Sequence, residues 1–358
     1  MKVIISGGGT GGHLYPALAI GREFAKHGAD ILYIGSEYGI EKMIMPNQEF
    51  PYQLLPVKGF GSKNPLILLK NADLVRKSYG MAKKIVAGYQ PDLIVGTGGY
   101  ASFPVMRAGA ACGVKTLLHE ANAEMGKANL KLAAVTDCLC LTYADTAKQI
   151  KNAKNIMITG MPVRSAVVNA TAEEGAEYIG IDEDTLLVTV TGGSQGAHHI
   201  NMAMAEYYKT YVPGRKVLFY HIVGKLNKED LPLMDYPFVK VKEYEERMDL
   251  VLARTDICIG RAGASFLAEI AVRGIPSILV PYPYSGGHQE KNASYYDRCG
   301  AAKMVLDGRM ADELPATLET LMDDAEARRK LGARMKEEAK ADALDRIVAA
   351  GLNLIKEK

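Results

Sequence analysis

The sequence predicts an α/β protein with two Rossmann-like, doubly wound parallel-sheet domains that face a cleft. Three observations lead to this fold class. Short, almost wholly apolar runs alternate with longer helix-like stretches, which is typical of parallel strands covered by helices on both faces. The chain has 358 residues, which is long for one domain and sufficient for two. The first strand-like run of each half ends in a glycine-rich motif, GGGTGGH at 7–13 and GGSQGAHH at 192–199, so the two halves repeat one plan.

The strand-like runs set the order of the elements. They occupy residues 2–6, 29–35, 92–98, 115–120, 137–142 and 155–160 in the first half, and residues 186–193, 216–224, 238–244, 256–263, 276–282 and 301–306 in the second. We therefore expect a first domain at residues 1–162 and a second at residues 163–335. Residues 163–184 show no strand pattern and are expected to form a linker with a short helix. A charge-rich helix is expected from about Ala325, with residues 336–358 packing back on the first domain.

The composition excludes several classes of protein. Hydrophobic residues make up 48% and charged residues 23% of the chain, and a net charge of +2 is too small to indicate nucleic-acid binding. The five cysteines are scattered without a CxxC spacing, which indicates reduced thiols. The strand-like start leaves no room for a signal peptide, and no apolar run approaches the ~20 residues that span a bilayer. We therefore expect a globular protein that is made and kept inside the cell.

The first glycine loop leads from a strand into a helix, where backbone N–H groups can hold an anion. Gly7, Gly9 and Gly12 satisfy the dinucleotide pattern GxGxxG, with Glu37 as the acid that would bind a ribose. This match is weak because a glycine-rich run satisfies many patterns, and an NAD-dependent oxidoreductase would leave the motifs of the second half unexplained. His13 follows on the first turn of the helix, next to whatever the loop binds. The alternative is a histidine that caps the helix or packs in the core.

The second half carries a more specific set of polar residues. Ser194, Gln195 and the N–H groups of residues 193–197 precede a helix and suit a diphosphate, although a plain strand-to-helix turn is the alternative. Glu269 lies in the first turns of a later helix, and Gln289 opens the helix after that. A carboxylate and an amide from adjacent loops could hold the two hydroxyls of a ribose, whereas each alone could be a cap or a solvated side chain. Together they favour a nucleotide.

The acidic motifs do not indicate a metal site. His119 and Glu120 are adjacent on an extended segment, so their side chains point in opposite directions and cannot easily bind one ion. Asp182 and Asp184 form a DxD pattern, which holds a metal–nucleotide complex in some sugar transferases. They lie in the expected linker, however, and are interpreted as a solvated turn. We therefore expect no metal and no cofactor.

One amphipathic stretch, residues 59–86, has two different faces. Lysines and arginines share one face with Leu66 and Leu69, and Lys70 lies beside them. Exposed leucines on a basic face suit an interfacial membrane contact, whereas a solvated face with two leucines under a loop is the alternative. The opposite stripe is expected to face the core and consists of Leu68, Ala72, Val75, Tyr79, Ala82 and Val86.

The motifs, taken in order, carry a resemblance to a known family. They are GGTGGH at 8–13, GTGGYAS at 96–102, HEAN at 119–122, GMPVR at 160–164, GGSQGA at 192–197, RAGA at 261–264 and HQEKNA at 288–293. This order resembles the MurG family of bacterial peptidoglycan glycosyltransferases, glycosyltransferase family 28, from about residue 2 to residue 306. The resemblance implies the two-Rossmann GT-B architecture, with the acceptor and the membrane at the first domain and UDP-GlcNAc at the second.

The resemblance also implies an activity and its setting. Members move N-acetylglucosamine from UDP-GlcNAc to the 4-hydroxyl of undecaprenyl-pyrophosphoryl-MurNAc-pentapeptide (lipid I), giving lipid II and UDP with inversion at the sugar. No metal is bound tightly for the chemistry. The implied place is the cytoplasmic side of the cell membrane, peripherally bound, in cell-wall synthesis, cell shape and cell division. Cell-wall or division proteins would be further partners.

Residues that match the family motifs take expected roles. We expect His13 to act as general base or to position the acceptor, because an imidazole can accept the proton of the attacking hydroxyl at neutral pH. Leu66, Leu69 and Lys70 lie where the family has its membrane-facing patch. The resemblance implies these donor contacts: Thr10, Gly11, Gly12 and Asn122 on the GlcNAc side, Ser194 and Arg164 at the diphosphate, Glu269 and Gln289 at the ribose and diphosphate, Tyr244 and Glu245 at the uracil, and Ala264, Ser265, Phe266, Leu267 and Ala268 completing the nucleotide pocket.

Two positions depart from the family pattern. Ala121 stands in HEAN where HEQN is usual, and Met161 stands in GMPVR where GNPVR is usual. Both changes bear on acceptor contacts. The remaining alternatives are a transferase of this architecture with a different lipid acceptor, a UDP-GlcNAc epimerase, and a non-catalytic UDP-sugar-binding subunit. An epimerase would need no membrane patch, and a binding subunit could lose His13.

Overall fold

The structure is a computed structural model that describes residues 1–59 and 64–357. The chain divides into two compact units, Met1–Pro162 with Asp342–Lys358 (unit 1) and Val163–Ala341 (unit 2). The first boundary coincides with the expected one, whereas the second lies at Ala341/Asp342 and not after residue 335. The reason is that residues just past 335 still pack in unit 2, where the Tyr295 hydroxyl donates to Glu338 Oε2 over 2.6 Å.

Unit 1 contains a sheet of seven parallel strands in the order β3-β2-β1-β4-β5-β6-β7. The strands are β1 (Lys2–Ser6), β2 (Asp30–Ser36), β3 (Tyr52–Leu55), β4 (Leu93–Gly96), β5 (Lys115–Glu120), β6 (Cys138–Leu141) and β7 (Ile156–Ile158). The chain order reverses between β1 and β4, and ligands of such sheets bind at the carboxyl end of the strands next to this point. The sequence missed β3, because only Leu55 of this short edge strand is buried.

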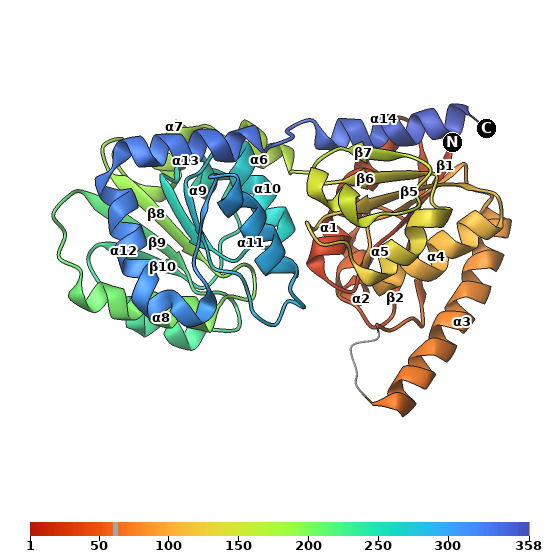
Figure 1. Ribbon diagram of the computed structural model, residues 1–358, viewed down its shortest axis with the longest axis horizontal. Coiled ribbons are helices and arrows are strands. Elements are labelled where there is room, and N and C mark those ends of the chain that lie inside the picture. The colour runs from red at the N-terminus through yellow and green to blue at the C-terminus, as the bar shows by residue number, and fades with distance from the viewer. Residues whose placement is uncertain (60–63, 358) are drawn as a thin grey trace. The chain divides into compact units, whose positions relative to one another are not determined.

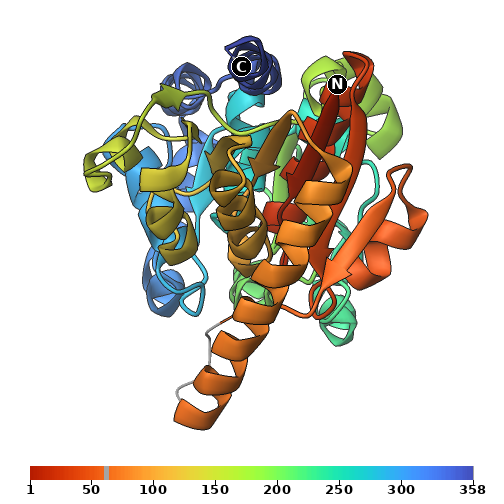
Figure 2. The same cartoon turned by 90° about the vertical axis from the view of Figure 1, so that its right-hand side faces the viewer.

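Helices cover both faces of this sheet (Figure 1). Val3 and Ile5 of β1 pack in one core with the helix that follows the first strand, and Ile4 packs in the other core. The helices of unit 1 are α1 (Gly11–Lys26), α2 (Glu41–Ile44), α3 (Pro65–Tyr89), α4 (Gly99–Ala111), α5 (Lys127–Leu132) and α14 (Ala343–Lys356), with 3₁₀ turns at Met45–Asn47, Ala133–Val135 and Ala144–Gln149. Helices α1 and α14 cover one face, and α3, α4 and α5 cover the other. Figure 2 shows α3 running along unit 1, with its N-terminal end extending beyond the sheet.

The C-terminal segment of the chain forms two helices, so the prediction of one helix from Ala325 was wrong. Helix α13 (Ala325–Glu337) belongs to unit 2, and α14 belongs to unit 1. Helix α14 buries its apolar stripe against α1, and a Cβ on Gly351 would lie 2.5 Å from Phe24 Cζ. The two helices bury their apolar faces in different cores, which requires a break between them.

Unit 2 contains six parallel strands in the order β10-β9-β8-β11-β12-β13. The strands are β8 (Leu186–Thr191), β9 (Val217–Ile222), β10 (Val239–Lys242), β11 (Ile257–Gly260), β12 (Ser277–Leu279) and β13 (Lys303–Met304). The helices are α6 (Ser165–Asn169), α7 (Ala172–Ile179), α8 (His198–Thr210), α9 (Met248–Arg254), α10 (Ala264–Arg273), α11 (His288–Arg298), α12 (Met310–Asp323) and α13, with 3₁₀ turns at Lys228–Met234 and Asp307–Arg309. Both units thus have the doubly wound parallel sheet that the sequence predicts.

Residues 163–184, expected to be a linker, form part of the second unit. They form α6 and α7, and α7 begins with a capping box in which Thr171 and Glu174 bond each other's backbone N–H groups. The Arg273 guanidinium donates to the carbonyls of Val167, Val168 and Ala170 and so fixes the end of α6. None of the described helices combines the length and the hydropathy needed to cross a bilayer.

Candidate active site

The glycine loop of unit 2 connects β8 to α8. Ser194 and Gln195 are exposed on it, and Gly193 and Gly196 adopt φ angles of 85° and 88°. A Cβ on Gly196 would lie 2.0 Å from the Val223 carbonyl, so this position has no room for a side chain. The Lys225 N–H donates to Ser194 O, and the N–H of the next residue donates to Gln195 O. The loop is therefore held from outside with its serine hydroxyl exposed.

A cavity of about 580 Å³ opens on this loop. Its walls are residues 192–199, residues 226–227, and side chains that include Arg261, Tyr282 and Gln289. Of the described residues that line it, none is acidic. The volume and the polar walls suit a diphosphate with an attached sugar.

Arg261 also lines this cavity, and no role was assigned to it from the sequence. Its side chain is 9% exposed, and its Nη1 donates to Val280 O, Pro281 O and Asp307 Oδ1. The signal in the sequence was an arginine directly after a buried strand, where parallel sheets place ligand groups.

Gln289 acts on the cavity wall through the loop before α11. Its Oε1 accepts the Tyr282 N–H over 3.0 Å, and its own N–H donates to Ser285 Oγ. Asn292, one turn later, donates from Nδ2 to Ala262 O over 3.2 Å. These two amides connect the loop before α11 with the segment before α10, so that both border the cavity in a fixed arrangement.

Arg164, expected at the diphosphate, and Glu269, expected at the ribose and diphosphate, are paired. Arg164 Nε donates to Glu269 Oε1 over 2.8 Å, and the arginine side chain is half-exposed. Burial opposes the charged form of Arg164, but the bond to Glu269 raises its pKa above the ordinary value. Leu267 has its side chain in the core, whereas Ala264, Ser265, Phe266 and Ala268 are partly exposed at the start of α10.

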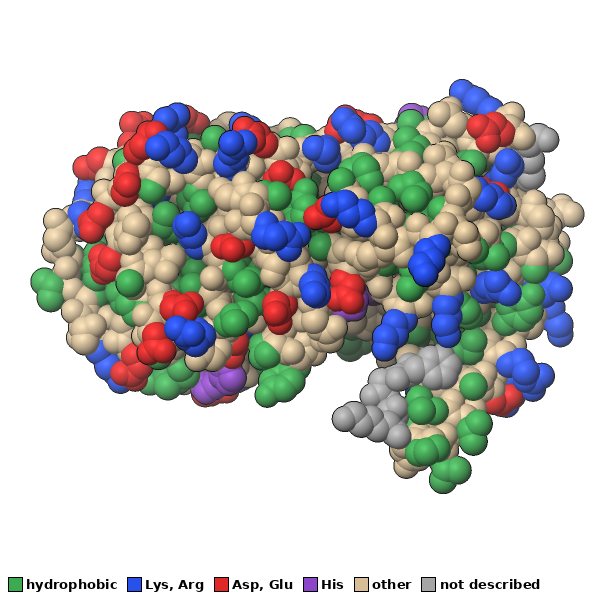
Figure 3. Space-filling view, viewed as in Figure 1, with side chains coloured by type: hydrophobic (Ala, Val, Ile, Leu, Met, Phe, Trp, Pro, Cys, Tyr) green, Lys and Arg blue, Asp and Glu red, His purple; other side chains and the backbone are tan. Residues whose placement is uncertain are grey.

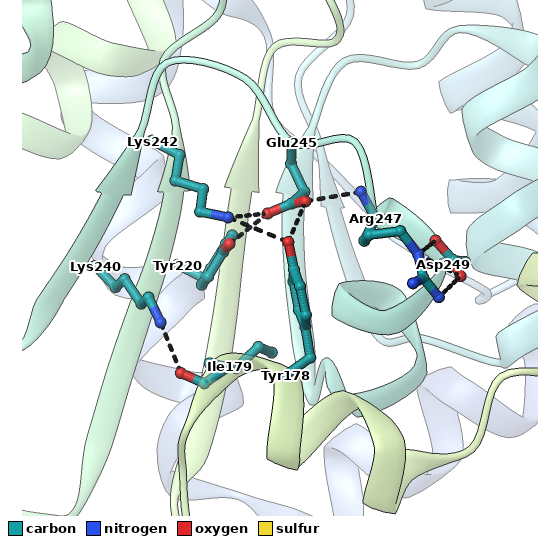
Figure 4. A network of polar contacts seen from close by, with 8 residues as sticks. All are labelled: Tyr178, Ile179, Tyr220, Lys240, Lys242, Glu245, Arg247 and Asp249. Atoms are coloured by element: carbon teal, nitrogen blue, oxygen red, sulfur yellow. Dashed lines mark hydrogen bonds and ion pairs between the residues drawn. The ribbon is translucent and has the colours of Figure 1, made fainter.

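Tyr244 and Glu245 follow β10 and have different environments. Tyr244 is 39% exposed, and Lys225 Nζ lies 3.9 Å from the centre of its ring. The Glu245 carboxylate is buried and accepts bonds from the Tyr178 and Tyr220 hydroxyls, Lys242 Nζ and Arg247 N (Figure 4). Burial acts in the other direction, but these bonds lower the pKa of Glu245 to about 2. The Glu245 side chain thus supports the loop, and only the backbone of Glu245 could contact a base.

The glycine loop of unit 1 connects β1 to α1 and holds His13 on the first turn of the helix. His13 Nδ1 lies 2.9 Å from Thr97 O, and the Thr97 hydroxyl donates to His13 O over 2.7 Å. A carbonyl oxygen only accepts, so Nδ1 carries the proton and Nε2 carries the lone pair of the neutral ring. Thr10 precedes the helix without a side-chain capping bond, and Gly12 is exposed beside it.

Asn122 is held by its neighbour Glu120. The buried carboxylate of Glu120 accepts the Asn122 N–H over 2.9 Å, the Gly126 N–H over 3.0 Å and Asn129 Nδ2 over 2.8 Å. His119 points elsewhere and bonds Gly160 O through Nε2, and burial lowers its pKa. The expectation that these adjacent side chains diverge is confirmed, and Glu120 orders the loop that carries Asn122.

The DxD motif and the two positions that depart from the family pattern have ordinary environments within the protein. Asp182 and Asp184 are on an exposed turn and bond Lys216 Nζ. Ala121 and Met161 are 2% and 3% exposed, so apolar side chains at both places pack in the interior. Within the described part of the chain, no three His, Cys, Asp or Glu side chains form a group that could hold a metal ion.

The start of α3 exposes apolar side chains. Leu66 is 76%, Ile67 45% and Leu69 69% exposed, and Lys70 is exposed beside them. Figure 3 shows hydrophobic side chains gathered at this end of α3. Residues 60–63 of the stretch lie outside the described residues. The opposite stripe faces the core at Val75, Tyr79, Ala82 and Val86, whereas Ala72 is exposed, so the expected stripe holds from Val75 onward.

Comparisons with known proteins cover nearly the whole chain. Residues 3–139 match the glycosyltransferase family 28 N-terminal domain, and residues 187–347 match the family's C-terminal domain. A UDP-N-acetylglucosamine–N-acetylmuramyl-(pentapeptide) pyrophosphoryl-undecaprenol N-acetylglucosamine transferase from Carboxydothermus hydrogenoformans is 39% identical, covering 100% of this chain and 99% of that protein. The enzyme of the same name from Halothermothrix orenii is 35% identical, with 97% of each chain covered. The crystal structure of Acinetobacter baumannii MurG has the same fold, with a TM-score of 0.82, 23% identity, and 98% of this chain and 99% of that chain covered.

Proposed function

Because the chain belongs to glycosyltransferase family 28, we propose that it transfers N-acetylglucosamine from UDP-GlcNAc to undecaprenyl-pyrophosphoryl-MurNAc-pentapeptide. The product is lipid II, and the role is peptidoglycan synthesis, on which cell shape and division depend. The observation that carries this proposal is the 35% and 39% identity, over the full length, to transferases named for this reaction.

On the acceptor side, His13 serves as general base. The bond from Nδ1 to Thr97 O fixes the tautomer, so Nε2 is the atom that takes the proton from the attacking 4-hydroxyl. An imidazole is suited to this because it exchanges a proton near neutral pH. Thr10, Gly11, Gly12 and Asn122 lie at the same sheet edge as His13 and contact the GlcNAc side of the donor.

On the donor side, the departing UDP needs its growing negative charge stabilised. Ser194 supplies a hydroxyl at the cavity, and the N-terminal turn of α10, from Ala264, supplies backbone N–H groups. Arg164 adds a positive charge, and its partner Glu269 accepts hydrogen bonds from the ribose hydroxyls. Gln289 fixes the cavity wall through Tyr282, and the backbone at Tyr244 and Glu245 holds the uracil. The sugar is displaced directly, which inverts its configuration.

The exposed start of α3 fits a contact with the membrane surface that carries a polyprenyl acceptor. We place the protein peripherally on the cytoplasmic face of the cell membrane, with Leu66 and Leu69 in the interface and Lys70 near anionic headgroups. Substituting both leucines with serine should weaken binding to anionic vesicles about 100-fold or more, because each buried leucine contributes ~1.5–3 kcal/mol. The matched control is Val212→Ser, an 83% exposed apolar residue in unit 2. Equal vesicle binding by both variants would contradict this placement.

The test of the function is label transfer. Purified protein is incubated with radiolabelled UDP-GlcNAc and vesicles that contain or lack lipid I. The expected result is label in a lipid-extractable product only when lipid I is present. Label converted to another UDP-sugar would identify an epimerase, and transfer to a different lipid would retain the donor half of the proposal and reject the acceptor half.

A further inference from the structure

Glu41 is a buried carboxylate at the glycine loop of unit 1. Its side chain is 0% exposed. Oε2 accepts the Gly9 N–H over 3.0 Å, and Oε1 accepts the Ser36 N–H over 3.0 Å. Among the described residues, no lysine, arginine or histidine forms an ion pair with it. Backbone N–H groups are thus its main partners, which is the arrangement by which such loops hold anionic ligands.

The backbone around Glu41 is shaped to admit this carboxylate. A Cβ on Gly8 would lie 2.0 Å from Glu41 Oε1, and a Cβ on Gly39 would lie 2.0 Å from Oε2. A Cβ on Gly35 would lie 3.0 Å from Glu41 Cγ. Glycines from two separate segments therefore leave the space that the carboxylate fills. Any side chain at Gly8 or Gly39 would displace it.

The same turn touches the surroundings of His13. A Cβ on Gly99 would lie 2.3 Å from Gly8 O and 3.1 Å from His13 Cδ2, and a Cβ on Gly98 would lie 3.1 Å from His13 Nδ1. The Gly8 backbone and the His13 ring therefore both pack against Gly99, and the ring also packs against Gly98, with no room for a side chain at either glycine. A shift of the Gly8–Gly9 turn would move the ring or its neighbours.

We propose that Glu41 is the positioning residue of this site: its carboxylate takes the backbone donor that a phosphate would otherwise use, fixes the Gly8–Gly9 turn, and thereby sets the place of the His13 ring. This inference rests on the proposed function for its kinetic part. It also removes the Gly9 N–H from the donors with which this loop could hold a phosphate, because Glu41 Oε2 already accepts it.

The first test substitutes Glu41 and measures the loop itself. Glu41→Gln keeps the size of the side chain, but its NH₂ group would face the N–H of Gly9 or of Ser36, and its one neutral oxygen accepts the other N–H more weakly than a carboxylate does, so both bonds are weakened or lost. Amide hydrogen exchange in a peptide spanning residues 5–14 should accelerate in this variant. The control is Glu49→Gln, whose carboxylate is on the surface and pairs with Arg22 of α1, the helix that also carries His13. Unchanged exchange in Glu41→Gln would overturn the proposal, whether or not the protein transfers sugar.

The second test is a double-mutant cycle on turnover with saturating substrates. Glu41→Gln should lower kcat about 100-fold, the cost of misplacing a reacting group by about 1 Å, and leave the KM for UDP-GlcNAc within about twofold. Because Glu41 acts through His13, combining Glu41→Gln with His13→Ala should lower kcat no further than His13→Ala alone. Additive losses, or a kcat within about twofold of Glu49→Gln, would overturn the inference.

Glu41→Asp guards against a folding defect. It keeps the charge but shortens the side chain, so its kcat should lie between those of the wild type and Glu41→Gln. If Glu41→Asp and Glu41→Gln both melt at the temperature of the wild type and have its kcat, the carboxylate has no positioning role. A wild type without any transfer activity would instead reject the proposed function, while the exchange experiment would still decide the structural part.

Discussion

The two glycine loops of this protein have equivalent places, each between the first strand of its unit and a following helix, and different electrostatic surroundings. The loop after β1 is occupied by the protein's own carboxylate, since Glu41 accepts the Gly9 N–H. The loop after β8 opens on a cavity of about 580 Å³, and none of the described residues lining that cavity is acidic. A glycine motif therefore shows that a backbone can approach something closely. The surrounding charges determine whether that partner is a ligand or a side chain.

The largest effect should come from the first loop. His13→Ala removes the proposed proton acceptor and should lower kcat by about 10²–10⁴-fold, the usual contribution of general base catalysis. The measurement is turnover with saturating UDP-GlcNAc and lipid I. Near-normal turnover would show that the first loop has no part in the chemistry and would remove the contrast between the loops.

A buried carboxylate of the second unit provides a different comparison with Glu41. Glu245 is held by Lys242 and two tyrosine hydroxyls, and its pKa is lowered to about 2. Since the folded pKa lies below the unfolded value, this group stabilises the fold above about pH 4.5, and that contribution is lost as the pH falls towards 2. Glu245→Gln should reduce the free energy of unfolding at pH 7 by the order of 3 kcal/mol.

Urea unfolding at pH 7 and pH 3 measures this effect, and the difference from the wild type should narrow at the lower pH. The adjacent and exposed Glu246 offers a control, because Glu246→Gln should change stability by no more than ~0.5 kcal/mol. A gap that stays constant between the two pH values would mean that the carboxylate charge is not what stabilises this loop.

The second loop should affect the leaving group. Ser194→Ala removes the hydroxyl that we propose stabilises the departing diphosphate, so turnover should fall about tenfold or more. The affinity for UDP should fall less, because the product needs less stabilisation than the transition state. Steady-state kinetics and calorimetry with UDP measure the two quantities. Equal losses of turnover and of UDP affinity would indicate that Ser194 binds the nucleotide without favouring the transition state.

The smallest expected effect is a change in amide exchange, and it compares the two loops in one experiment. Inorganic pyrophosphate should slow amide exchange in peptides that cover residues 186–200 and leave peptides that cover residues 4–14 unchanged. The reason is that the Gly9 N–H is already bonded to a carboxylate, which repels a second anion. Protection of both regions would show that the first loop also accepts phosphate.

The fold followed from the sequence wherever strands are buried on both faces. Val3, Ile4 and Ile5 show this, because they contribute to cores on both sides of the sheet and so form an unbroken apolar run. The edge strand β3 gave no such signal, since Tyr52 and Gln53 are exposed. Residues 163–184 hold two short helices where one was expected, because short helices such as α6 are fixed by distant contacts, here from Arg273.

The sequence indicated which loops form the candidate site, but it did not indicate which side chains pair with one another there. Glycine motifs and strand ends located His13 and Ser194, but Glu37, offered as the acid after β2, is exposed, and the buried acid is Glu41 four residues later. The bond between Arg164 and Glu269 joins residues 105 positions apart, and no local pattern encodes it. Such pairings depend on tertiary packing, and the same holds for Arg261 at the cavity.

The central claim is that the first loop serves the acceptor chemistry and the second binds the nucleotide. The most direct test is the dissociation constant of UDP for His13→Ala, measured by calorimetry beside the wild type. We expect equal dissociation constants, within about twofold, for the wild type and for a variant whose turnover has collapsed. A dissociation constant raised tenfold or more, about 1.4 kcal/mol, would contradict the division of roles between the two loops.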